Sequence, residues 1–598
     1  MSGSDHPGAN TSARQVSIHD TPAALLACLA LAVPMLMAFN MPPSATYFNQ
    51  ALAMLGWGGW MVLLAKAGPD RGSPLPREAS AAFPALALLT VAALVAPMWT
   101  GLPWALALSN AALLAAAGLT ATLGAGACRV GKGVSVFTAV CIALVLAGLV
   151  SSVIGIIQVF APGLADGDWI ARTSVEGRAV GNLRQPNHLC SLLLWAIVAV
   201  VWLGEARVLR RAFSLALAAL MLFVVVLSGS RSGVIGAAML ALWGLLDSRL
   251  TRPSRVALLL APVAYGLFWL GTSAWAQHSQ HVFGGAGRFS TGGDISSSRF
   301  GIWSNTLDLI RAYSWAGVGF GEFNFAWSLT EFPNRPVAFF DHTHNLPLQF
   351  AVELGLPLAA LVLALLGWAL WRAVRNCLWP ADHAQPISPQ RAALAMVLLV
   401  LVHSLLEYPL WYAYFLLPAS FALGICLGNP PVSIKAQGEK APVLQRQFRL
   451  FQVASLTLVL GTAYSFYDYM RVVVIFAPPD NAPPLTERIT LGQRSMFFSH
   501  HADYAAATTS QDPTIALHAA QRAAHYLLDT RLMMAWANAL RATGDTERAK
   551  YVAQRLKEFS NPQSEAYFAP CNDATLKDTA KPYQCFAPQR KFTFEDFR

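Results

Sequence analysis

Charged residues are scarce in this chain. Of its 598 residues only 12% are charged, whereas 55% are hydrophobic, and the mean hydropathy is +0.45. This much apolar surface exceeds what one water-soluble core buries, which excludes an ordinary soluble protein. Apolar runs long enough to cross a hydrocarbon layer of about 30 Å as helices start near residues 23, 50, 80, 104, 134, 188, 212, 234, 256, 346, 392, 410 and 449. The sequence therefore predicts an all-α polytopic membrane protein with about thirteen transmembrane helices.

The first apolar run lacks the signature of a cleaved leader. Ala23 to Phe39 follows a polar segment whose only strong base is Arg14, and the run ends in NMPPS without a small-residue cleavage pattern. We therefore expect it to be retained as the first membrane helix.

Lysine and arginine are missing from every second short loop. Loops 40–49, 97–103 and 408–411 contain neither residue, whereas the loops that alternate with them are basic. Because basic loops stay in the cytoplasm, the N-terminus is predicted inside, and DHTHN (341–345) and the tail outside. The net charge of +10 is then explained by topology, and no nucleic-acid partner is needed.

The predicted spans divide the chain into five segments. These are a cytoplasmic leader (1–22), transmembrane helices 1–9 (23–276), a long external loop (277–345), transmembrane helices 10–13 (346–468) and an external tail (469–598). Small and apolar residues recur in the tail at helical spacing around a Thr-Gly-Asp turn, which resembles a tetratricopeptide (TPR) helix pair. We expect a TPR-like helical domain there. It is either a folded cap or a platform on which an acceptor docks.

The tail also holds two of the eight cysteines, Cys571 and Cys585, whereas the other six lie in or beside apolar helices. Outside the cytoplasm a disulfide between Cys571 and Cys585 is expected, with two unpaired thiols as the alternative.

Polar residues crowd the predicted outer ends of several helices, where they are costly and often functional. GNLRQPNH (181–188) brings Arg184, Gln185, Asn187 and His188 to the start of the sixth helix, although capping of that helix by Asn187 is the simpler interpretation. SGSRSG (228–233) sets Arg231 among backbone donors that suit a phosphate, although helical hairpins also use such turns for closure.

Two further polar segments follow. SSSRFGIWSNTLDLI (296–310) is predicted as an amphipathic helix with Arg299 at its start. In HSLLEYPLWYAYF (403–415), His403 and Glu407 are four residues apart and are expected to share one helix face. The aromatic residues that begin at Tyr408 are also what a membrane-boundary belt would supply.

DHTHN raises the question of a metal site. Three or four ligands are needed, and His-x-His supplies two, with Asp341 as a third. Nothing nearby in the sequence completes the set, so we predict no metal. A histidine here is also suited to deprotonate a hydroxyl, with Glu353 as its orienting partner. A purely structural role for His344 is the alternative.

Taken in order, these segments resemble a known family. GNLRQPNH, SGSRSG, SSSRFGIW, the H-N-x9-G pattern of His344, Asn345 and Gly355, and HSLLEYPLWYAYFL are similar to those of bacterial O-oligosaccharyltransferases of the PglL type, within the O-antigen ligase and polymerase superfamily. The resemblance implies an inner-membrane enzyme with a periplasmic active site. It would transfer a preassembled glycan from undecaprenyl pyrophosphate to a Ser or Thr hydroxyl of a protein such as pilin.

The resemblance also implies residue roles. Arg231 and Arg299, with Arg184 as a weaker third, would hold the donor pyrophosphate, and His344 would activate the acceptor hydroxyl. No metal or other cofactor is expected. Supporting polar roles are implied or expected for Gln185, Asn187, His188, Asn345, Glu353 and Tyr408.

Two other functions remain open at this stage. One is a ligase or polymerase of the same superfamily that acts on a lipid A core sugar or a glycan. The other is a transporter or flippase without chemistry. Against the transporter, the polar groups gather on one side of the membrane, and the sequence shows no inverted repeat and no nucleotide-binding motif.

Overall fold

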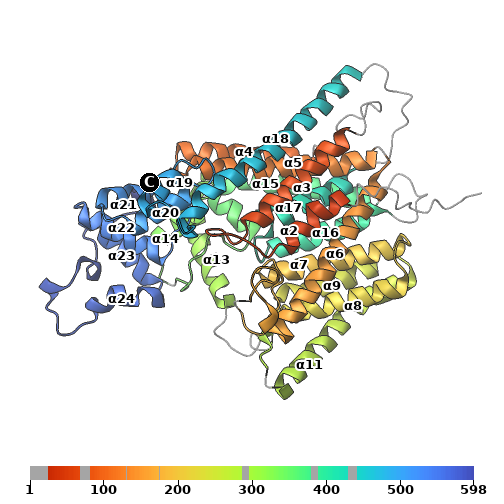
Figure 1. The fold of residues 1–598 in the computed structure, drawn as a ribbon, viewed down its shortest axis with the longest axis horizontal. Helices are drawn as coiled ribbons and strands as arrows, with labels where there is room; N and C mark the ends of the chain where they lie inside the picture. The colour runs from red at the N-terminus through yellow and green to blue at the C-terminus, as the bar shows by residue number, and fades with distance from the viewer. Residues whose placement is uncertain are drawn as a thin grey trace, which may run out of the picture.

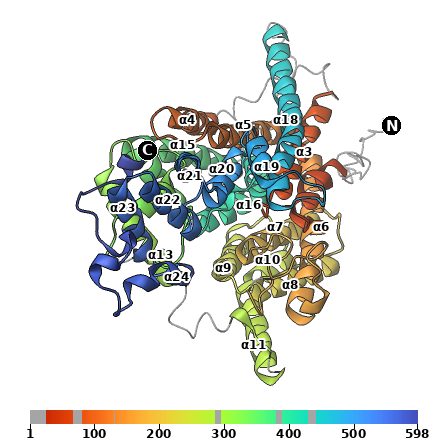
Figure 2. The same cartoon turned by 60° about the vertical axis from the view of Figure 1, so that its left-hand side comes forward.

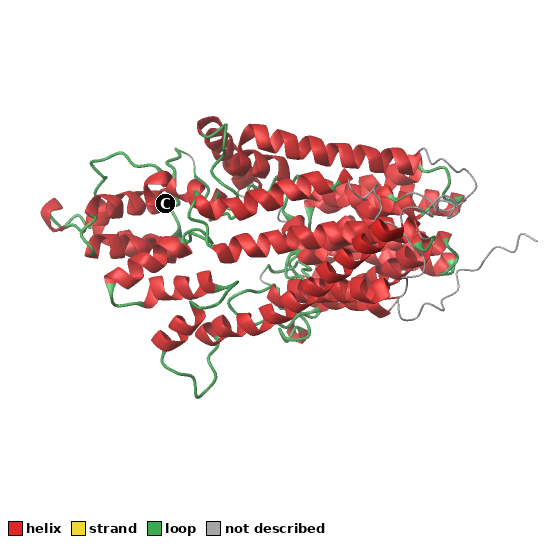
Figure 3. Ribbon diagram, turned by 90° about the horizontal axis from the view of Figure 1, so that it is seen from above, coloured by secondary structure: helices red, strands yellow, loops and turns green. Residues whose placement is uncertain are grey.

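The computed structural model describes residues 25–66, 81–129, 131–173, 175–279, 281–285, 295–333, 335–378, 388–428 and 441–598. Within these ranges every regular element is a helix and there is no strand, which confirms the all-α prediction. The apolar helices form one large bundle, and the C-terminal helices form a second lobe at one end of it (Figures 1 and 3).

The N-terminal half of the chain forms the first half of the bundle. Its elements are the π-helical segment η1 (Cys28–Ala32), α2 (Val33–Leu36), α3 (Tyr47–Lys66), α4 (Phe83–Val95), η4 (Ala96–Met98), α5 (Trp104–Arg129), α6 (Gly133–Phe160), η5 (Pro162–Leu164), α7 (Pro186–Glu205), α8 (Arg211–Leu227), α9 (Arg231–Leu246), α10 (Arg252–Leu259) and α11 (Ala261–Ser279).

The second half of the bundle comes after a stretch that holds two helices. These are α13 (Ile295–Ala312) and α14 (Phe323–Leu329). The chain then returns to the bundle with α15 (Leu346–Leu378), α16 (Pro389–Ser404), η6 (Pro409–Trp411), α17 (Ala413–Leu427) and α18 (Ala441–Phe476).

Five helices in the described part of the chain are long and apolar enough to cross a membrane by themselves. They are α5, α6, α7, α15 and the Arg449–Phe476 part of α18, and the pair α10–α11, bent by 46°, makes a sixth if it counts as one span. Six of the other predicted runs form apolar helices of only 10–17 residues. A perpendicular crossing needs about 20 residues. The chain is therefore a multi-pass membrane protein, but helix length and composition do not by themselves give thirteen crossings.

Helix α7 lies at the centre of the bundle. Every residue from His188 to Glu205 is buried, and α7 packs against α6, α8, α9 and α16 (Figure 1). Its sequence is apolar on all sides until Glu205, which is typical of a helix surrounded by others. The segment that carries Gln185 and Asn187 is thereby fixed at one end of the core.

The tail is a series of short packed helices. They are α19 (Leu485–Gly492), α20 (Ser499–Thr509), α21 (Pro513–Ala523), α22 (Thr530–Ala542), α23 (Thr546–Glu558) and α24 (Glu565–Phe568), followed by 3₁₀ turns η9 (Ala569–Cys571), η10 (Asp578–Ala580), η11 (Tyr583–Cys585) and η12 (Phe594–Phe597), with η8 (Pro562–Ser564) before α24. Asp512, Asp529 and Asp545 accept backbone hydrogen bonds at the starts of α21, α22 and α23, as N-cap residues do. From α19 to α23 each helix packs on the next.

The stretch between α13 and α15 and the tail share one hydrophobic core. Trp327 of α14 lies within it beside Phe559, at a ring distance of 5.5 Å. Polar contacts cross the same boundary: His525 Nδ1 lies 2.9 Å from Glu322, and Tyr551 donates to the Leu329 carbonyl at 2.7 Å. Figure 2 shows α13 on the tail side of the bundle. The tail therefore supports the stretch that leads into DHTHN.

A disulfide links the 3₁₀ turns η9 and η11 near the end of the tail. Cys571 and Cys585 are bonded to each other in the structure, across a sequence separation of 14. The other six cysteines are free thiols, and all but Cys28 are buried.

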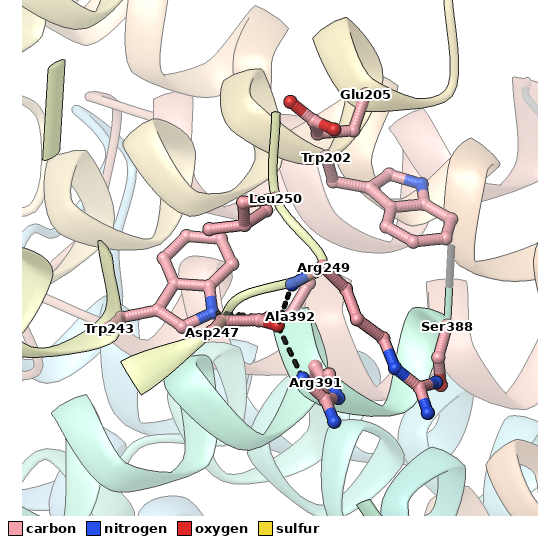
Figure 4. A pocket seen from close by; sticks show the side chains of 9 residues that line it. All are labelled: Trp202, Glu205, Trp243, Asp247, Arg249, Leu250, Ser388, Arg391 and Ala392. Atoms are coloured by element: carbon pink, nitrogen blue, oxygen red, sulfur yellow. Dashed lines mark hydrogen bonds and ion pairs between the residues drawn. The ribbon is translucent and has the colours of Figure 1, made fainter. Parts of the chain in front are cut away.

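The opposite end of the bundle carries a buried ion pair. Asp247, just after α9, accepts from the guanidinium of Arg391, from Arg249 N at 3.2 Å and from Trp243 Nε1 at 3.3 Å (Figure 4). Because these contacts join α9 to the first turn of α16, they hold two helices together.

Candidate active site

A single buried carboxylate joins three distant segments of the chain. Oε1 of Glu407 accepts from Asn187 Nδ2 at 2.7 Å and from the guanidinium of Arg299, while Oε2 lies 2.8 Å from His344 Nδ1. Its side chain is only 5% exposed. Hydrogen bonds to charged groups are among the strong ones, so this carboxylate fixes the relative positions of an arginine and a histidine.

The prediction that Glu407 and His403 share a helix face is wrong. Helix α16 ends at Ser404, and Pro409 disfavours helical geometry at Tyr408. The Nδ1 of His403 instead lies 2.6 Å from the Ser191 hydroxyl inside the bundle. The two side chains thus belong to different clusters, and only Glu407 reaches the candidate site.

The backbone at His344 has an unusual conformation. Its φ is +55°, in the left-handed region that residues other than glycine rarely occupy. The preceding Thr343 is held on both sides: its N–H donates to Gln349 Oε1 at 2.7 Å, and its carbonyl accepts from Trp303 Nε1 at 2.9 Å. Strained backbone held by its surroundings is frequent at functional sites. The loop is therefore built to aim the His344 side chain.

The contact with Glu407 also orients the imidazole. When Nδ1 donates to the carboxylate, the lone pair of His344 lies on Nε2, which is then the basic atom. The His344 side chain is 13% exposed, so it is largely but not wholly enclosed. Carboxylate–histidine pairs of this kind hold the tautomer and stabilise the imidazolium that forms on proton uptake.

Arg299 approaches the same carboxylate from α13. Its side chain is 18% exposed, and its buried Nε has no hydrogen-bond partner among the described residues. Buried donors are normally satisfied, so an open donor on an arginine marks a place where an anion can bind.

The SGSRSG turn is joined to this cluster through one hydroxyl. Ser230, the residue before α9, donates to Asn187 Oδ1 at 2.6 Å, and Asn187 donates in turn to Glu407. Arg231 is the first residue of α9, directly after Ser230. Gly229 has a φ of +58°, and a Cβ there would lie 3.1 Å from Gly285 Cα, so the turn requires glycine.

The polar residues around Pro186 have four different surroundings. Gln185 caps α7, its Oε1 accepting from His188 N at 2.6 Å, so capping by Asn187 is wrong. Arg184 donates to the carbonyls of Ala38 and Ala45, away from Glu407. His188 is buried, with Nδ1 3.3 Å from the Tyr414 hydroxyl. Asn187 alone reaches Glu407.

The ring of Tyr408 contacts both histidines of DHTHN. Tyr408 stacks on His342 with centroids 4.4 Å apart and contacts His344 at 5.0 Å. His342 Nδ1 in turn lies 3.0 Å from Asp341 Oδ1, so the two histidines of DHTHN pair with different acids. In the described part of the chain no group of three or more His, Cys, Asp or Glu is arranged to hold a metal.

Glu353 is not the partner of His344. Its Oε1 accepts from Gln349 Nε2 at 2.8 Å, and Gln349 Oε1 accepts from Thr343 N. Glu353 therefore supports the loop indirectly, through Gln349. Asn345 Oδ1 accepts from Leu348 N at 3.1 Å in the first turn of α15. The acid that orients His344 is Glu407, which the sequence spacing pairs with His403 instead.

The glycine of the H-N-x9-G pattern has a packing reason. Gly355 interrupts α15 with φ +74°, and a Cβ there would lie 2.2 Å from the Trp315 carbonyl oxygen. The break lets the chain after α13 pack closely: Gly319 N donates to Glu353 O at 3.0 Å. The histidine loop and the end of α13 are thereby held together.

In comparison with known proteins, three family models match parts of this chain. Residues 216–363 match the family described as O-Antigen ligase, residues 179–203 match Protein glycosylation ligase, and residues 391–567 match Virulence factor membrane-bound polymerase, C-terminal. Together these segments include Arg231, Arg299, His344, Asn187 and Glu407.

Two curated relatives come from Acinetobacter baylyi (strain ATCC 33305 / BD413 / ADP1). A general O-oligosaccharyltransferase is 30% identical over 265 residues, which is 42% of this chain and 44% of the relative. A ComP-specific O-oligosaccharyltransferase is 24% identical over 347 residues, 56% of each chain. The chain thus spans about half the length of the curated relatives it matches. The resemblance to O-antigen ligases and PglL-type O-oligosaccharyltransferases is confirmed.

Proposed function

We propose that this protein is an O-oligosaccharyltransferase. It transfers a preassembled glycan from undecaprenyl pyrophosphate to a Ser or Thr hydroxyl of a periplasmic protein such as a pilin. The observation that carries the proposal is the contact of one carboxylate, Glu407, with both His344 and Arg299. A proton acceptor and a cation for a leaving phosphate are thus joined within one network.

The reaction needs a base on one side and positive charge on the other. Nε2 of His344 takes the proton of the acceptor hydroxyl while the hydroxyl oxygen attacks the anomeric carbon of the glycan. The bond from that carbon to the pyrophosphate oxygen breaks, and its electrons leave with the pyrophosphate. Glu407 stabilises the imidazolium, and Arg299 and Arg231 neutralise the departing charge.

Arg299 can serve the donor without leaving Glu407. A guanidinium has five N–H donors, and Arg299 contacts Glu407 through one terminal nitrogen, Nη2. The unpartnered Nε is available to a phosphate oxygen. Arg184, which is engaged with Ala38 and Ala45, would have to give up these contacts before it bound pyrophosphate.

The same proposal includes a topology. We infer about thirteen crossings of the inner membrane, with the candidate site and the tail in the periplasm. The basic-loop asymmetry supports this orientation. The tail is a TPR-like unit that braces the histidine loop through Glu322 and His525 and offers its outer face to an acceptor protein. Neither a metal nor another cofactor takes part in the proposed reaction.

A second acceptor class is favoured by one observation: residues 216–363 match the O-Antigen ligase family. One assay distinguishes a protein acceptor from a lipid A core acceptor. Purified protein is given a defined lipid-linked glycan with either pilin or lipid A core, and each acceptor is followed by its mass shift. A shift on pilin supports the proposal. A shift on lipid A core alone, absent in His344→Ala, assigns the chain to lipopolysaccharide ligation.

A further inference from the structure

An apolar groove lies between α7, α8, α10 and the start of α11, and none of the candidate site residues lines it. It encloses a cavity of ≈ 220 Å³. Apart from Arg211, Ser214 and Ser254, every residue that lines it is apolar. Protein interiors contain few voids of this size, so the groove requires an explanation.

Small side chains and a helix bend produce the groove. α10 packs on α9, and α11 is bent from α10 by 46°, so that it projects from the bundle (Figures 1 and 2). The residues facing the space include Gly204 of α7, Ala218 of α8, and Ala257 and Ala261 at the bend. Such side chains leave the space between the helices unfilled. In a bilayer, hydrocarbon is the medium that fills it.

Positive charge marks one end of the groove. Arg211, the first residue of α8, lines it and is exposed, and no carboxylate is among the lining residues. Glu205, which follows Gly204, is buried and already accepts from Thr251 Oγ1 at 2.6 Å and Ser254 Oγ at 2.5 Å. The groove therefore combines an apolar slot with one exposed cation, Arg211.

We propose that this groove binds an acyl chain of an anionic membrane phospholipid, with the lipid phosphate on Arg211. Basic residues between transmembrane helices commonly bind such head groups on the cytoplasmic side. α8 has 17 residues and therefore rises about 25 Å from Arg211 to the turn at Ser228. The bound head group is thus at the opposite membrane interface from the candidate active site and is not the glycan donor. The inference rests on the proposed topology but not on the proposed reaction.

Native mass spectrometry of the full-length protein in detergent tests the proposal. The protein is mixed with equal amounts of dioleoylphosphatidylglycerol and dioleoylphosphatidylethanolamine, and the lipid retained per protein is counted. Wild type should retain one phosphatidylglycerol in preference to phosphatidylethanolamine. Arg211→Gln should lower that preference about fivefold, the effect of about one basic residue at a membrane surface.

Arg210→Gln is the matched control, because Arg210 is also exposed and adjacent but does not line the groove. It should leave the preference unchanged. Ala218→Trp fills the groove and should reduce retention of both lipids; if that variant does not fold, the Arg211 and Arg210 comparison decides alone. Equal retention of the two lipids by wild type, or equal effects of the two arginine variants, would overturn the proposal. One-for-one displacement of phosphatidylglycerol by added undecaprenyl phosphate would assign the groove to the polyprenyl chain instead.

Discussion

The imidazole Nδ1 of His344 lies 2.8 Å from Oε2 of Glu407, although 63 positions separate the two residues in the sequence. Arg299 contacts the other oxygen of the same carboxylate. Glu407 therefore has two opposing effects in the proposed reaction: it makes His344 a better base, and it competes with phosphate for Arg299.

Glu407→Gln should separate these effects. The amide cannot stabilise an imidazolium, so we expect glycan transfer to fall by about 10²- to 10⁴-fold. Donor affinity should not fall, because the competitor of phosphate for Arg299 has lost its charge. Single-turnover transfer and equilibrium binding of the lipid-linked donor measure the two quantities.

Glu331→Gln is the control for that variant, since its carboxylate is 79% exposed and contacts only Arg555 among the ion pairs of the described chain. Both quantities should stay near wild type. If Glu407→Gln lost donor binding and turnover to the same extent, the carboxylate would be a structural tie and not a partner of the base.

Arg299 should act mainly on the donor. Removing a charge-assisted contact costs about 1.5 to 3 kcal/mol, so Arg299→Ala should weaken donor binding about 10- to 100-fold. Arg299→Lys should restore only part of it, because lysine keeps the charge but not the planar fork. Arg311→Ala on the same helix, whose guanidinium is exposed and pairs with Asp308, serves as the comparison. Unchanged donor affinity in Arg299→Ala would remove this residue from the pyrophosphate site.

The tail should lose stability in acid. Burial lowers the pKa of His501 in α20 from 6.5 to about 4. The unfolded chain therefore binds a proton first as the pH falls, and the stabilising effect, complete above about pH 6.5, is lost progressively towards pH 4. The hydrogen-exchange protection factors of α20 amides in the full-length protein, which are corrected for the intrinsic exchange rate at each pH, should fall through this window. His501→Gln should flatten the dependence, whereas replacing the exposed His518 should leave it as in wild type. An unaltered profile in His501→Gln would contradict the assignment.

Thiol counting checks the tail disulfide. The structure has six free cysteines and one bonded pair, so the denatured protein isolated from membranes should react with six equivalents of maleimide before reduction and eight after it. Eight equivalents without reductant would mean that Cys571 and Cys585 are unpaired.

Local patterns predicted the helices and the residue types of the site, but not the contacts between them. Apolar runs determine where helices form, and the motifs around Arg231, Arg299 and His344 are contiguous in sequence. The partner of His344 was misassigned because Glu353 is near in sequence, whereas Glu407 is brought in by the turn before Pro409.

The same reason explains why the sequence left two roles open for Asn187, helix capping and a place in the site. Pro186 correctly indicated the start of α7, but Gln185 and Asn187 are both capable of capping it. Asn187 is the one that enters the site because it donates to Glu407, which lies 220 residues away in the sequence. The packing of the tail on the external stretch, with Glu322 and His525 separated by 203 residues, is likewise invisible to local spacing.

The central claim is that His344 is the base for transfer to a hydroxyl, without a metal. The direct measurement is glycan transfer from a purified undecaprenyl-pyrophosphate-linked donor to an acceptor pilin, followed by mass, with wild type and His344→Ala each assayed with and without excess EDTA. We predict that wild type is equally active in both conditions, and that His344→Ala loses about 10²- to 10⁴-fold in transfer while it still binds donor. Full activity of His344→Ala, or loss of wild-type activity in EDTA that added metal restores, would contradict the account.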